Sequence, residues 1–177
     1  MARAALLPAH AGKTDGADGA NDEAMEVGRE VRRVRIREAE LDDAQGLASL
    51  YQQARPGEGE TVATVRAYLG SGYSLLVEGG AGEVLAAVRW QPEGDGWAVD
   101  RVATLPTERG NSFGRWLMTR LEALAIRGNV KSLTLQLDDE TLLPYYRRMG
   151  YQQAGDDQMG LSKRVGGTWQ RQAQRGV

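Results

Sequence analysis

The chain has 177 residues, 41% of them hydrophobic, and its 22 basic and 24 acidic side chains give a formal net charge of −2. This length builds one domain with a sizeable core, and the near balance of charge argues against duplex nucleic acid as a partner. The absence of cysteine and the single histidine, His10, exclude disulfides, thiolate or histidine-based metal sites, a cysteinyl acyl-enzyme and a Ser-His-Asp triad. We therefore expect no metal.

Both ends of the chain are predicted to be unstructured. Residues 1–30 form an acidic leader rich in Gly and Ala, which cannot bury enough apolar surface to offset the entropy of ordering. Residues 166–177 form a basic tail, and the folded domain is expected over residues 31–165. No segment approaches the roughly 18 apolar residues of a membrane span, and Pro8 interrupts the apolar start that a secretory signal would need. We expect a cytoplasmic protein without a membrane partner.

The domain is predicted to open with one strand and two helices. An alternating apolar pattern near residues 33–37 is typical of a strand. Apolar residues then recur every three or four positions over 41–54, and Arg55-Pro56-Gly57 ends that helix. A second helix is predicted from residue 60 or 61 to residue 69, where Gly70 follows.

The later elements are separated by turns that contain glycine. They are strands at 73–78, 83–91 and 97–105, a helix at 114–127, a strand at 131–137, a short helix ending at Gly150, and closing strands. Turns at 79–82 and 92–96 join the first three of these strands. No internal repeat is present.

The turn before the helix at 114–127 reads Arg109-Gly110-Asn111-Ser112-Phe113-Gly114. Small residues here can aim several free backbone N–H groups at one point, where the helix N-terminus adds about half a positive charge. Glycine permits the close approach and positive φ values that an anion held by the backbone requires. The turn is either a phosphate cradle or only a tight connection. It is no P-loop, because Gly114-Arg115-Trp116 stands where Gly-Lys-Ser/Thr is needed, and the glycines lie too late for a dinucleotide fold.

This segment resembles the pyrophosphate-binding motif of the GNAT N-acetyltransferase superfamily, Arg/Gln-x-x-Gly-x-Gly/Ala, which follows a strand of the form Arg-Leu-Ala-Val-x-Pro. The strand here reads Arg101-Val102-Ala103-Thr104-Leu105-Pro106, and the motif begins at Arg109. One departure is Ser112, which stands where the family usually has its middle glycine. Serine is small and can donate a hydroxyl to a phosphate, but it tolerates positive φ less well. The resemblance implies binding of coenzyme A.

A second block, Tyr146-Arg147-Arg148-Met149-Gly150-Tyr151, resembles the family's Tyr-x-Lys-x-Gly-Phe/Tyr signature, in which a helix ends at a C′ glycine. In the family the tyrosine hydroxyl lies near the sulfur of acetyl-coenzyme A and can protonate the departing thiolate, so Tyr146 matches the general acid. The alternative is that Tyr146 only packs on the sheet, as Tyr145 can. Asp139 stands where many members carry Asn, and Pro144 precedes the tyrosines, so the start of this helix can depart from the family's geometry.

The resemblance covers residues from about 34 to 165 and implies a mixed α/β fold of the GNAT type. Its central sheet would be mostly antiparallel, with helices on both faces and one splayed parallel pair of strands, 99–105 and 132–137, between which the family inserts the pantetheine arm. Main-chain groups of Val102 and Thr104 would pair with the pantetheine, and the N–H of Val102 would polarise the thioester carbonyl. The residues at the pyrophosphate contact positions are Arg109, Gly110, Asn111, Ser112, Phe113, Gly114 and Arg115.

The resemblance implies an acyltransferase that moves an acetyl group from acetyl-coenzyme A directly to an amine in a ternary complex. The acceptor is either a small-molecule amine or a protein amino group. Because an ammonium has no lone pair, a base is needed, and Asp100 ranks ahead of Glu58 and Glu60. The alternative for Asp100 is that it pairs with an arginine such as Arg101 or faces water.

Two other functions stay open at this point. One is a catalytically silent module that binds acetyl-coenzyme A as a sensor or regulatory protein, and the other is a nucleic-acid adaptor that uses the basic strand Arg32 to Arg37 and the basic tail. Trp90 and Trp97 either wall an acceptor pocket or pack in the core. Arg147 and Arg148 either touch coenzyme A phosphates or form a solvated helix face. The sequence leaves both the acceptor and the choice between monomer and homodimer open.

Overall fold

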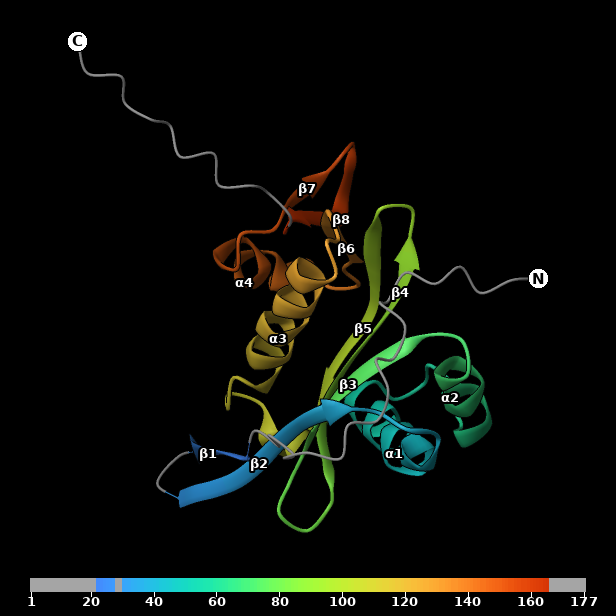
Figure 1. Ribbon diagram of the computed structural model, residues 1–177, viewed down its shortest axis with the longest axis vertical. Helices are drawn as coiled ribbons and strands as arrows, with labels where there is room; N and C mark the ends of the chain where they lie inside the picture. Colours follow the sequence, from blue (N-terminus) through green and yellow to red (C-terminus); the bar gives the residue numbers. More distant parts are fainter. Residues whose placement is uncertain (1–21, 28–29, 166–177) are drawn as a thin grey trace.

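The structure, a computed structural model, describes residues 22–27 and 30–165 (Figure 1). These residues form one eight-stranded sheet in the order β1-β2-β3-β4-β5-β6-β8-β7, in which every neighbouring pair is antiparallel except β5 and β6. The strands are β1 (Asp22–Val27), β2 (Glu30–Glu38), β3 (Tyr73–Glu78), β4 (Val84–Glu93), β5 (Gly96–Thr104), β6 (Ser132–Gln136), β7 (Gln152–Ala154) and β8 (Asp157–Arg164). The helices are α1 (Ala44–Ala54), α2 (Val62–Leu69), α3 (Phe113–Arg127) and α4 (Leu143–Arg148), with 3-10 turns η1 (Leu41–Asp43), η2 (Pro106–Glu108) and η3 (Glu140–Leu142).

Helices cover both faces of this sheet (Figure 1). On one face, α1 and α2 bury Leu47, Tyr51 and Val65 against residues of β3 to β5. On the other face, α3 packs its apolar side on the central strands in a second and larger core. The fully buried residues of α3 lie on one face of the helix and are Phe113, Leu117, Met118, Leu121 and Ala125. The predicted mixed α/β fold class is confirmed.

Local sequence explains where the helices begin and end. Thr61 caps α2: its Oγ1 accepts from the Thr64 N–H at 3.2 Å, and the Thr64 Oγ1 accepts from the Thr61 N–H at 2.9 Å. The predicted end of α1 at Arg55 is confirmed, since its N–H closes the last turn on the Tyr51 carbonyl. None of the helices in the described ranges combines the length and apolar character that crossing a bilayer requires.

The structure differs from the sequence prediction at two places. Composition predicts an unstructured leader through residue 30, whereas residues 22–27 form β1. Antiparallel pairing with β2 holds this strand, and such pairing cannot be inferred from composition. The strand β4 also runs through the predicted turn as far as Glu93, and Pro92 is tolerated there because β3 pairs with β4 only up to Trp90. The rest of the leader and the predicted tail at 166–177 lie outside the described residues.

The parallel pair β5 and β6 is joined along only part of its length. Pairing covers three residues, from Trp97 opposite Leu133 to Val99 opposite Leu135. The next residue, Asp100, has no partner in β4, where Arg101 lies opposite Arg89 and Val99 opposite Trp90, so Asp100 is the extra residue of a β-bulge. A bulge bends and twists its strand. Beyond it β5 runs free of β6, as the predicted splay requires.

Candidate functional site

A cleft of about 700 Å³ opens where β5 and β6 part. Five segments meet around it. They are the end of α1 with the loop after it (Ala54, Arg55, Glu58), β5 from Val99 to Thr104, the turn from Glu108 to Gly114 apart from Asn111, the chain from Leu135 to Asp139, and the helix region with Leu142, Tyr145 and Tyr146. The cleft therefore brings together the two sequence blocks that resemble the GNAT motifs.

The free edge of β5 turns unpaired main-chain groups toward this cleft. The Leu105 N–H donates to the carbonyl of Leu85 in β4 at 2.9 Å. Main-chain groups alternate in direction along a strand, so those of Ala103 point toward β4 as well, whereas those of Val102 and Thr104 point away from it. No strand covers that side beyond Val99 among the described residues. The residues expected to contact pantetheine thus present open donors and acceptors.

The turn between β5 and α3 contains two residues with left-handed backbone. Gly110 has φ +89° and Ser112 has φ +63°, so both lie in the left-handed region. The demand for positive φ at Ser112 accounts for the glycine that the motif usually has there, and a serine in this conformation costs about 1 to 2 kcal/mol. Within the described residues no protein acceptor is recorded for the N–H groups of Gly110, Ser112, Phe113, Gly114 and Arg115.

Two residues of the predicted cradle are engaged within the protein instead. The Arg109 N–H donates to the Pro106 carbonyl at 3.5 Å, and the Asn111 N–H donates to the Glu108 carbonyl at 3.4 Å. The Asn111 side chain also donates to the Glu108 carboxylate at 2.9 Å, and Asn111 does not line the cleft. Both N–H groups are therefore engaged by carbonyl groups of the 3-10 turn before α3, and contacts of Arg109 and Asn111 with coenzyme A stay a prediction.

Gly114 faces a point where three cleft residues converge. A Cβ placed on Gly114 would lie 3.6 Å from the Tyr145 hydroxyl, 3.8 Å from Val102 Cγ1 and 3.9 Å from Thr104 Oγ1. These are ordinary contacts, so the glycine is not required by packing of the protein on itself. The space that a side chain would take belongs to the cleft, beside the first free amides of α3.

Tyr146 is the more deeply buried of the two adjacent tyrosines. Its side chain is 6% exposed, and its ring makes edge contacts with Tyr145 and Tyr151 at centroid distances of 5.1 and 5.7 Å. Burial raises the pKa of the Tyr146 phenol to about 12, Tyr145 adds to the rise, and the nearby Arg55 guanidinium opposes it. A phenol with this pKa keeps its proton at neutral pH and can only donate it.

Asp100, the predicted base, is held in an ion pair. Both of its oxygens accept from Arg89 Nε at 2.9 Å, so the alternative of pairing with an arginine is observed, with Arg89 in place of Arg101. The bulge turns Asp100 and Arg101 to the same face of the sheet, toward α1. Trp90 and Trp97 are 4% and 8% exposed and pack together in the core, with ring centroids 5.5 Å apart, and neither lines the cleft, so the pocket-wall alternative is wrong.

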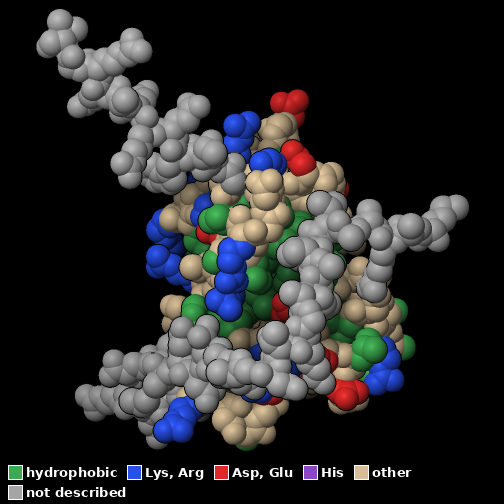
Figure 2. All heavy atoms as spheres, viewed as in Figure 1, with side chains coloured by type: hydrophobic (Ala, Val, Ile, Leu, Met, Phe, Trp, Pro, Cys, Tyr) green, Lys and Arg blue, Asp and Glu red, His purple; other side chains and the backbone are tan. Residues whose placement is uncertain are grey.

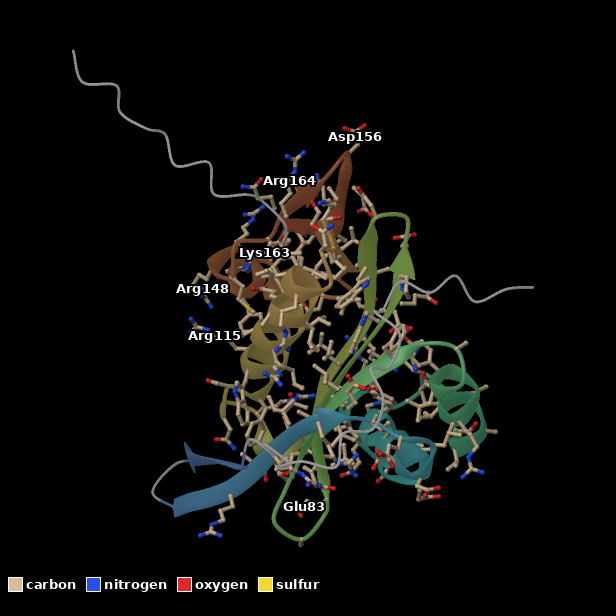
Figure 3. The ribbon with its side chains drawn as sticks, viewed as in Figure 1. Glu83, Arg115, Arg148, Asp156, Lys163 and Arg164 are labelled. Atoms are coloured by element: carbon tan, nitrogen blue, oxygen red, sulfur yellow. The ribbon has the colours of Figure 1, made fainter. Side chains whose placement is uncertain are left out.

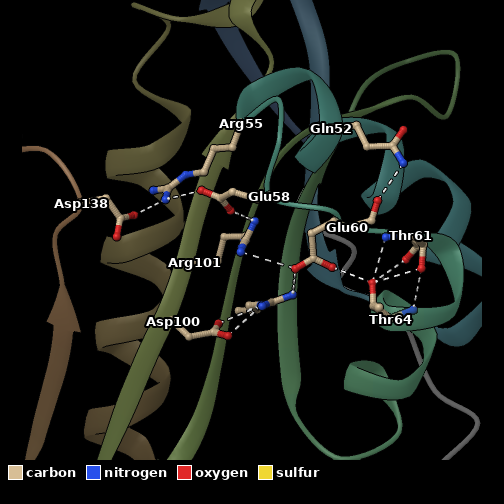
Figure 4. A network of polar contacts seen from close by, with 10 residues as sticks. Gln52, Arg55, Glu58, Glu60, Thr61, Thr64, Asp100, Arg101 and Asp138 are labelled. Atoms are coloured by element: carbon tan, nitrogen blue, oxygen red, sulfur yellow. Dashed lines mark hydrogen bonds and ion pairs between the residues drawn. The ribbon is translucent and has the colours of Figure 1, made fainter.

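Asp100 belongs to a larger network of charged side chains that runs from the sheet to the wall of the cleft (Figure 4). Arg89 Nη1 lies 2.9 Å from Glu60 Oε1, and Arg101 Nη2 lies 3.5 Å from the same oxygen. Arg101 also forms an ion pair with Glu58. At the outer end, Arg55 binds both Glu58 and Asp138; this side chain connects the loop after α1 to the end of β6. Sequence reasoning did not find Arg55, Arg89 or Asp138, because partners up to 83 residues apart leave no pattern in the chain.

Positive side chains gather on the outside of α3 and α4 (Figure 2). Arg115 of α3 and Arg148 of α4 project outward there, and both are exposed (Figure 3). Arg147 is exposed as well, so both arginines of the second block fit a solvated helix face. In the described ranges, no group of three or more His, Cys, Asp or Glu side chains is placed to hold a metal ion.

The acetyltransferase (GNAT) domain family matches residues 58–153, which is more than half of the chain. The chain belongs to the GNAT acetyltransferase family. The matched region of this GNAT chain contains β5, the turn at 109–114, the splay of β5 from β6 and Tyr146. It ends before β8, and it begins at Glu58 in the loop after α1.

Solved structures share the GNAT fold with this chain. The ribosomal-protein-S18-alanine N-acetyltransferase from Escherichia coli has a TM-score of 0.67 at 16% identity, over 78% of this chain and 97% of that one. PaiA N-acetyltransferase from Thermoplasma acidophilum, in complex with coenzyme A, has a TM-score of 0.60 at 11% identity, over 74% and 98%. A GNAT family acetyltransferase from Brucella melitensis, in complex with acetyl-CoA, has a TM-score of 0.61 at 22% identity, over 76% and 90%. No curated protein sequence matches the chain.

Proposed function

We propose that this GNAT chain is an N-acetyltransferase that transfers an acetyl group from acetyl-coenzyme A directly to an amine in a ternary complex. The observation that carries the proposal is the open edge of β5, where the main-chain groups of Val102 and Thr104 face a cleft next to unpaired amides at the start of α3. Solved relatives of the same fold hold coenzyme A or acetyl-CoA. The residues present here suit that ligand.

The donor half of the site would use backbone for most of its contacts. The amides of Gly110, Ser112, Phe113 and Gly114 would hold the diphosphate, because free N–H groups and the helix N-terminus favour an anion. The pantetheine arm would then lie along β5 in the place of a missing strand, paired with Val102 and Thr104. The exposed Arg115 follows the cradle directly and adds a positive charge near it.

The transfer step needs one proton removed and one supplied. The neutral amine nitrogen would form a bond to the thioester carbonyl carbon, the carbon–sulfur bond would break, and Tyr146 would give its proton to the departing thiolate. The N–H of Val102 would stabilise the charge that develops on the carbonyl oxygen. The proton lost by the amine would leave toward water or a carboxylate of the charge network, with Asp100 available only when Arg89 releases it.

The test combines the full chain, acetyl-coenzyme A and a panel of primary amines, and measures free thiol and acetylated amine in the same samples. The proposal expects equal amounts of the two products with at least one amine. A thermal-shift series with coenzyme A and acetyl-coenzyme A runs beside it, since a ligand at 100 times its Kd adds about 2.7 kcal/mol of stability. A stabilised protein that acetylates no amine contradicts the proposal and identifies a silent acetyl-coenzyme A binder.

A further inference from the structure

The bulge in β5 decides which main-chain groups reach the cleft. Side chains alternate between the two faces of a regular strand, so residues three apart lie on opposite faces. Val99 and Val102 nevertheless pack in the same core, the one under α3, whereas Ala103 packs in the core of α1 and α2. The extra residue at Asp100 accounts for this, because it shifts every later residue of β5 by one position. A strand without the bulge would turn the N–H of Val102 toward β4 and away from the cleft.

The bulge also brings two charged side chains to one face of the sheet. Asp100 and Arg101 both turn toward α1, and a charge enclosed there needs a partner. Arg89 of β4 lies directly opposite Arg101 in the ladder, and like charges in this position repel each other. The Asp100 carboxylate offsets the repulsion, and both of its oxygens accept from Arg89 Nε at 2.9 Å (Figure 4). The ion pair therefore stabilises the bulge against a regular register.

Arg89 is itself held firmly by the two helices on this face. Its side chain is 12% exposed, and its guanidinium lies over the rings of Tyr68 in α2 and Tyr51 in α1, at 4.4 and 5.5 Å from their centroids. Its Nη1 lies 2.9 Å from Glu60 Oε1. The other oxygen of Glu60 accepts from Thr64 Oγ1 at 2.9 Å, in the first turn of α2. The bulge residue is thus paired with a side chain that has little freedom to move.

We propose that Arg89 is a positioning residue for the acetyl donor, because its ion pair with Asp100 holds the bulge that directs the N–H of Val102 into the cleft. This inference rests on the proposed function, in which the pantetheine arm pairs with β5 and the Val102 N–H stabilises the charge on the carbonyl oxygen. Arg89 does not line the cleft, so it acts through the strand. Asp100 then contributes through its charge and its place in β5, without transferring a proton.

The experiment measures how much the pantetheine arm adds to binding by the full chain. Calorimetry gives the Kd for coenzyme A and the Kd for adenosine 3′-phosphate 5′-diphosphate, which is the part of coenzyme A without the arm. Arg89→Met removes the donors of Arg89 and keeps an unbranched side chain that can pack on the two tyrosines. We expect the Kd for coenzyme A to rise about tenfold, as for one or two lost main-chain hydrogen bonds, while the Kd for the nucleotide stays within about a factor of two.

The rate should change more than the affinity. With any amine that the chain acetylates, Arg89→Met should lower kcat about 100-fold, as when one oxyanion donor is lost. The KM for the amine should change little, because Arg89 does not reach the cleft. A rise in this KM with kcat unchanged would overturn the inference.

Arg37→Met is the matched control for loss of a half-buried arginine. Arg37 forms ion pairs with Asp43 and Glu78, and none of these three residues lines the cleft. This variant should lower the thermal midpoint and leave both Kd values and kcat unchanged. If the two variants change the Kd for coenzyme A equally, Arg89 contributes only stability and the inference is wrong.

Asp100→Ala makes the same test from β5, and it decides the matter if Arg89→Met does not fold. It should raise the Kd for coenzyme A and lower kcat as Arg89→Met does. The double variant should add little to either effect, since the two side chains act as one unit. A general base at this position predicts instead a fall in kcat with an unchanged Kd for coenzyme A, and that result would overturn the inference.

The binding measurements separate this inference from the proposed function. A chain that binds coenzyme A but acetylates no amine contradicts the proposed function and leaves the affinity test of Arg89 intact. Wild-type affinity for coenzyme A in both Arg89→Met and Asp100→Ala overturns the inference and leaves acetyl transfer intact. A wild-type chain that binds no coenzyme A overturns both.

Discussion

At the scale of single residues, a substitution at Gly114 tests ligand binding without disturbing the fold. Its φ is not positive, and an added methyl group would meet only ordinary contacts, so Gly114→Ala should fold with unchanged or slightly higher stability. The methyl group would nevertheless fill the space beside Tyr145, Val102 and Thr104 that the proposed donor needs. We expect the Kd of Gly114→Ala for acetyl-coenzyme A, measured by calorimetry, to be at least tenfold higher than that of the wild type. The thermal midpoint of the ligand-free protein should be unchanged. Unchanged affinity would place the donor elsewhere.

Tyr146 supplies the second prediction at this scale. Tyr146→Phe should lower kcat about 100-fold, as expected for a lost general acid, while affinity for acetyl-coenzyme A stays within a factor of two or three. Tyr145→Phe is the matched control and should keep most of kcat, because its hydroxyl lies beside Gly114. Because burial raises the Tyr146 pKa to about 12, the wild-type rate should show no alkaline decline below about pH 10. Equal kcat for Tyr146→Phe and wild type removes this residue from the mechanism.

At the scale of elements, Arg37 of β2 joins the 3-10 turn before α1 to the neighbouring strand β3. Its guanidinium donates to both oxygens of Asp43 at 2.7 Å and to Glu78 of β3 at 2.8 Å. We expect Arg37→Ala to lower the free energy of unfolding by about 2 kcal/mol at pH 7, measured by urea denaturation. A loss below about 0.3 kcal/mol would show that the pair is solvated like an ordinary surface pair.

The pH dependence of this contribution has a definite sign. The hydrogen bonds from Arg37 hold the pKa values of Asp43 and Glu78 below their usual 3.8 and 4.5. Depressed carboxyl pKa values stabilise the fold above the unfolded values and stop doing so as pH falls through the folded ones. The difference in stability between wild type and Arg37→Ala should therefore be full at pH 6 and shrink below about pH 4.

The elements also show what a sequence can and cannot predict here. The turn at 109–114 and the block at Tyr146 lie between elements of clear periodicity, so their meeting in one cleft follows from the order of strands and helices. The partner of Asp100 does not follow, because it depends on a one-residue bulge that sends Asp100 and Arg101 to the same face. Burial of Trp90 and Trp97 is likewise decided by packing across strands.

At the scale of the whole molecule, buried tyrosines limit stability at high pH. Burial raises the pKa values of Tyr51 and Tyr146 to about 12, and burial raises that of Tyr151 as well. In the unfolded chain these phenols ionise near pH 10. Raised pKa values contribute stability that is complete below the unfolded value and is lost as pH rises toward the folded one.

The chain should therefore lose about 1.4 kcal/mol of unfolding free energy per pH unit for each such tyrosine between pH 10 and pH 12. Urea denaturation followed at pH 9, 10 and 11 measures this slope. Tyr51→Phe should flatten it, because one titrating group is removed from the unfolded state. Stability that stays constant from pH 9 to pH 11 would mean that these phenols ionise equally in both states.

The central claim is that the amides at the start of α3 and the open edge of β5 bind acetyl-coenzyme A together. A chain of 19.3 kDa is suited to amide-resolved NMR, so titration with acetyl-coenzyme A tests the claim residue by residue. We predict the largest shifts at Val102, Thr104, Gly110 and Gly114, with little change in β1 and β2. Shifts confined to other parts of the chain, or none at saturating ligand, would contradict the account.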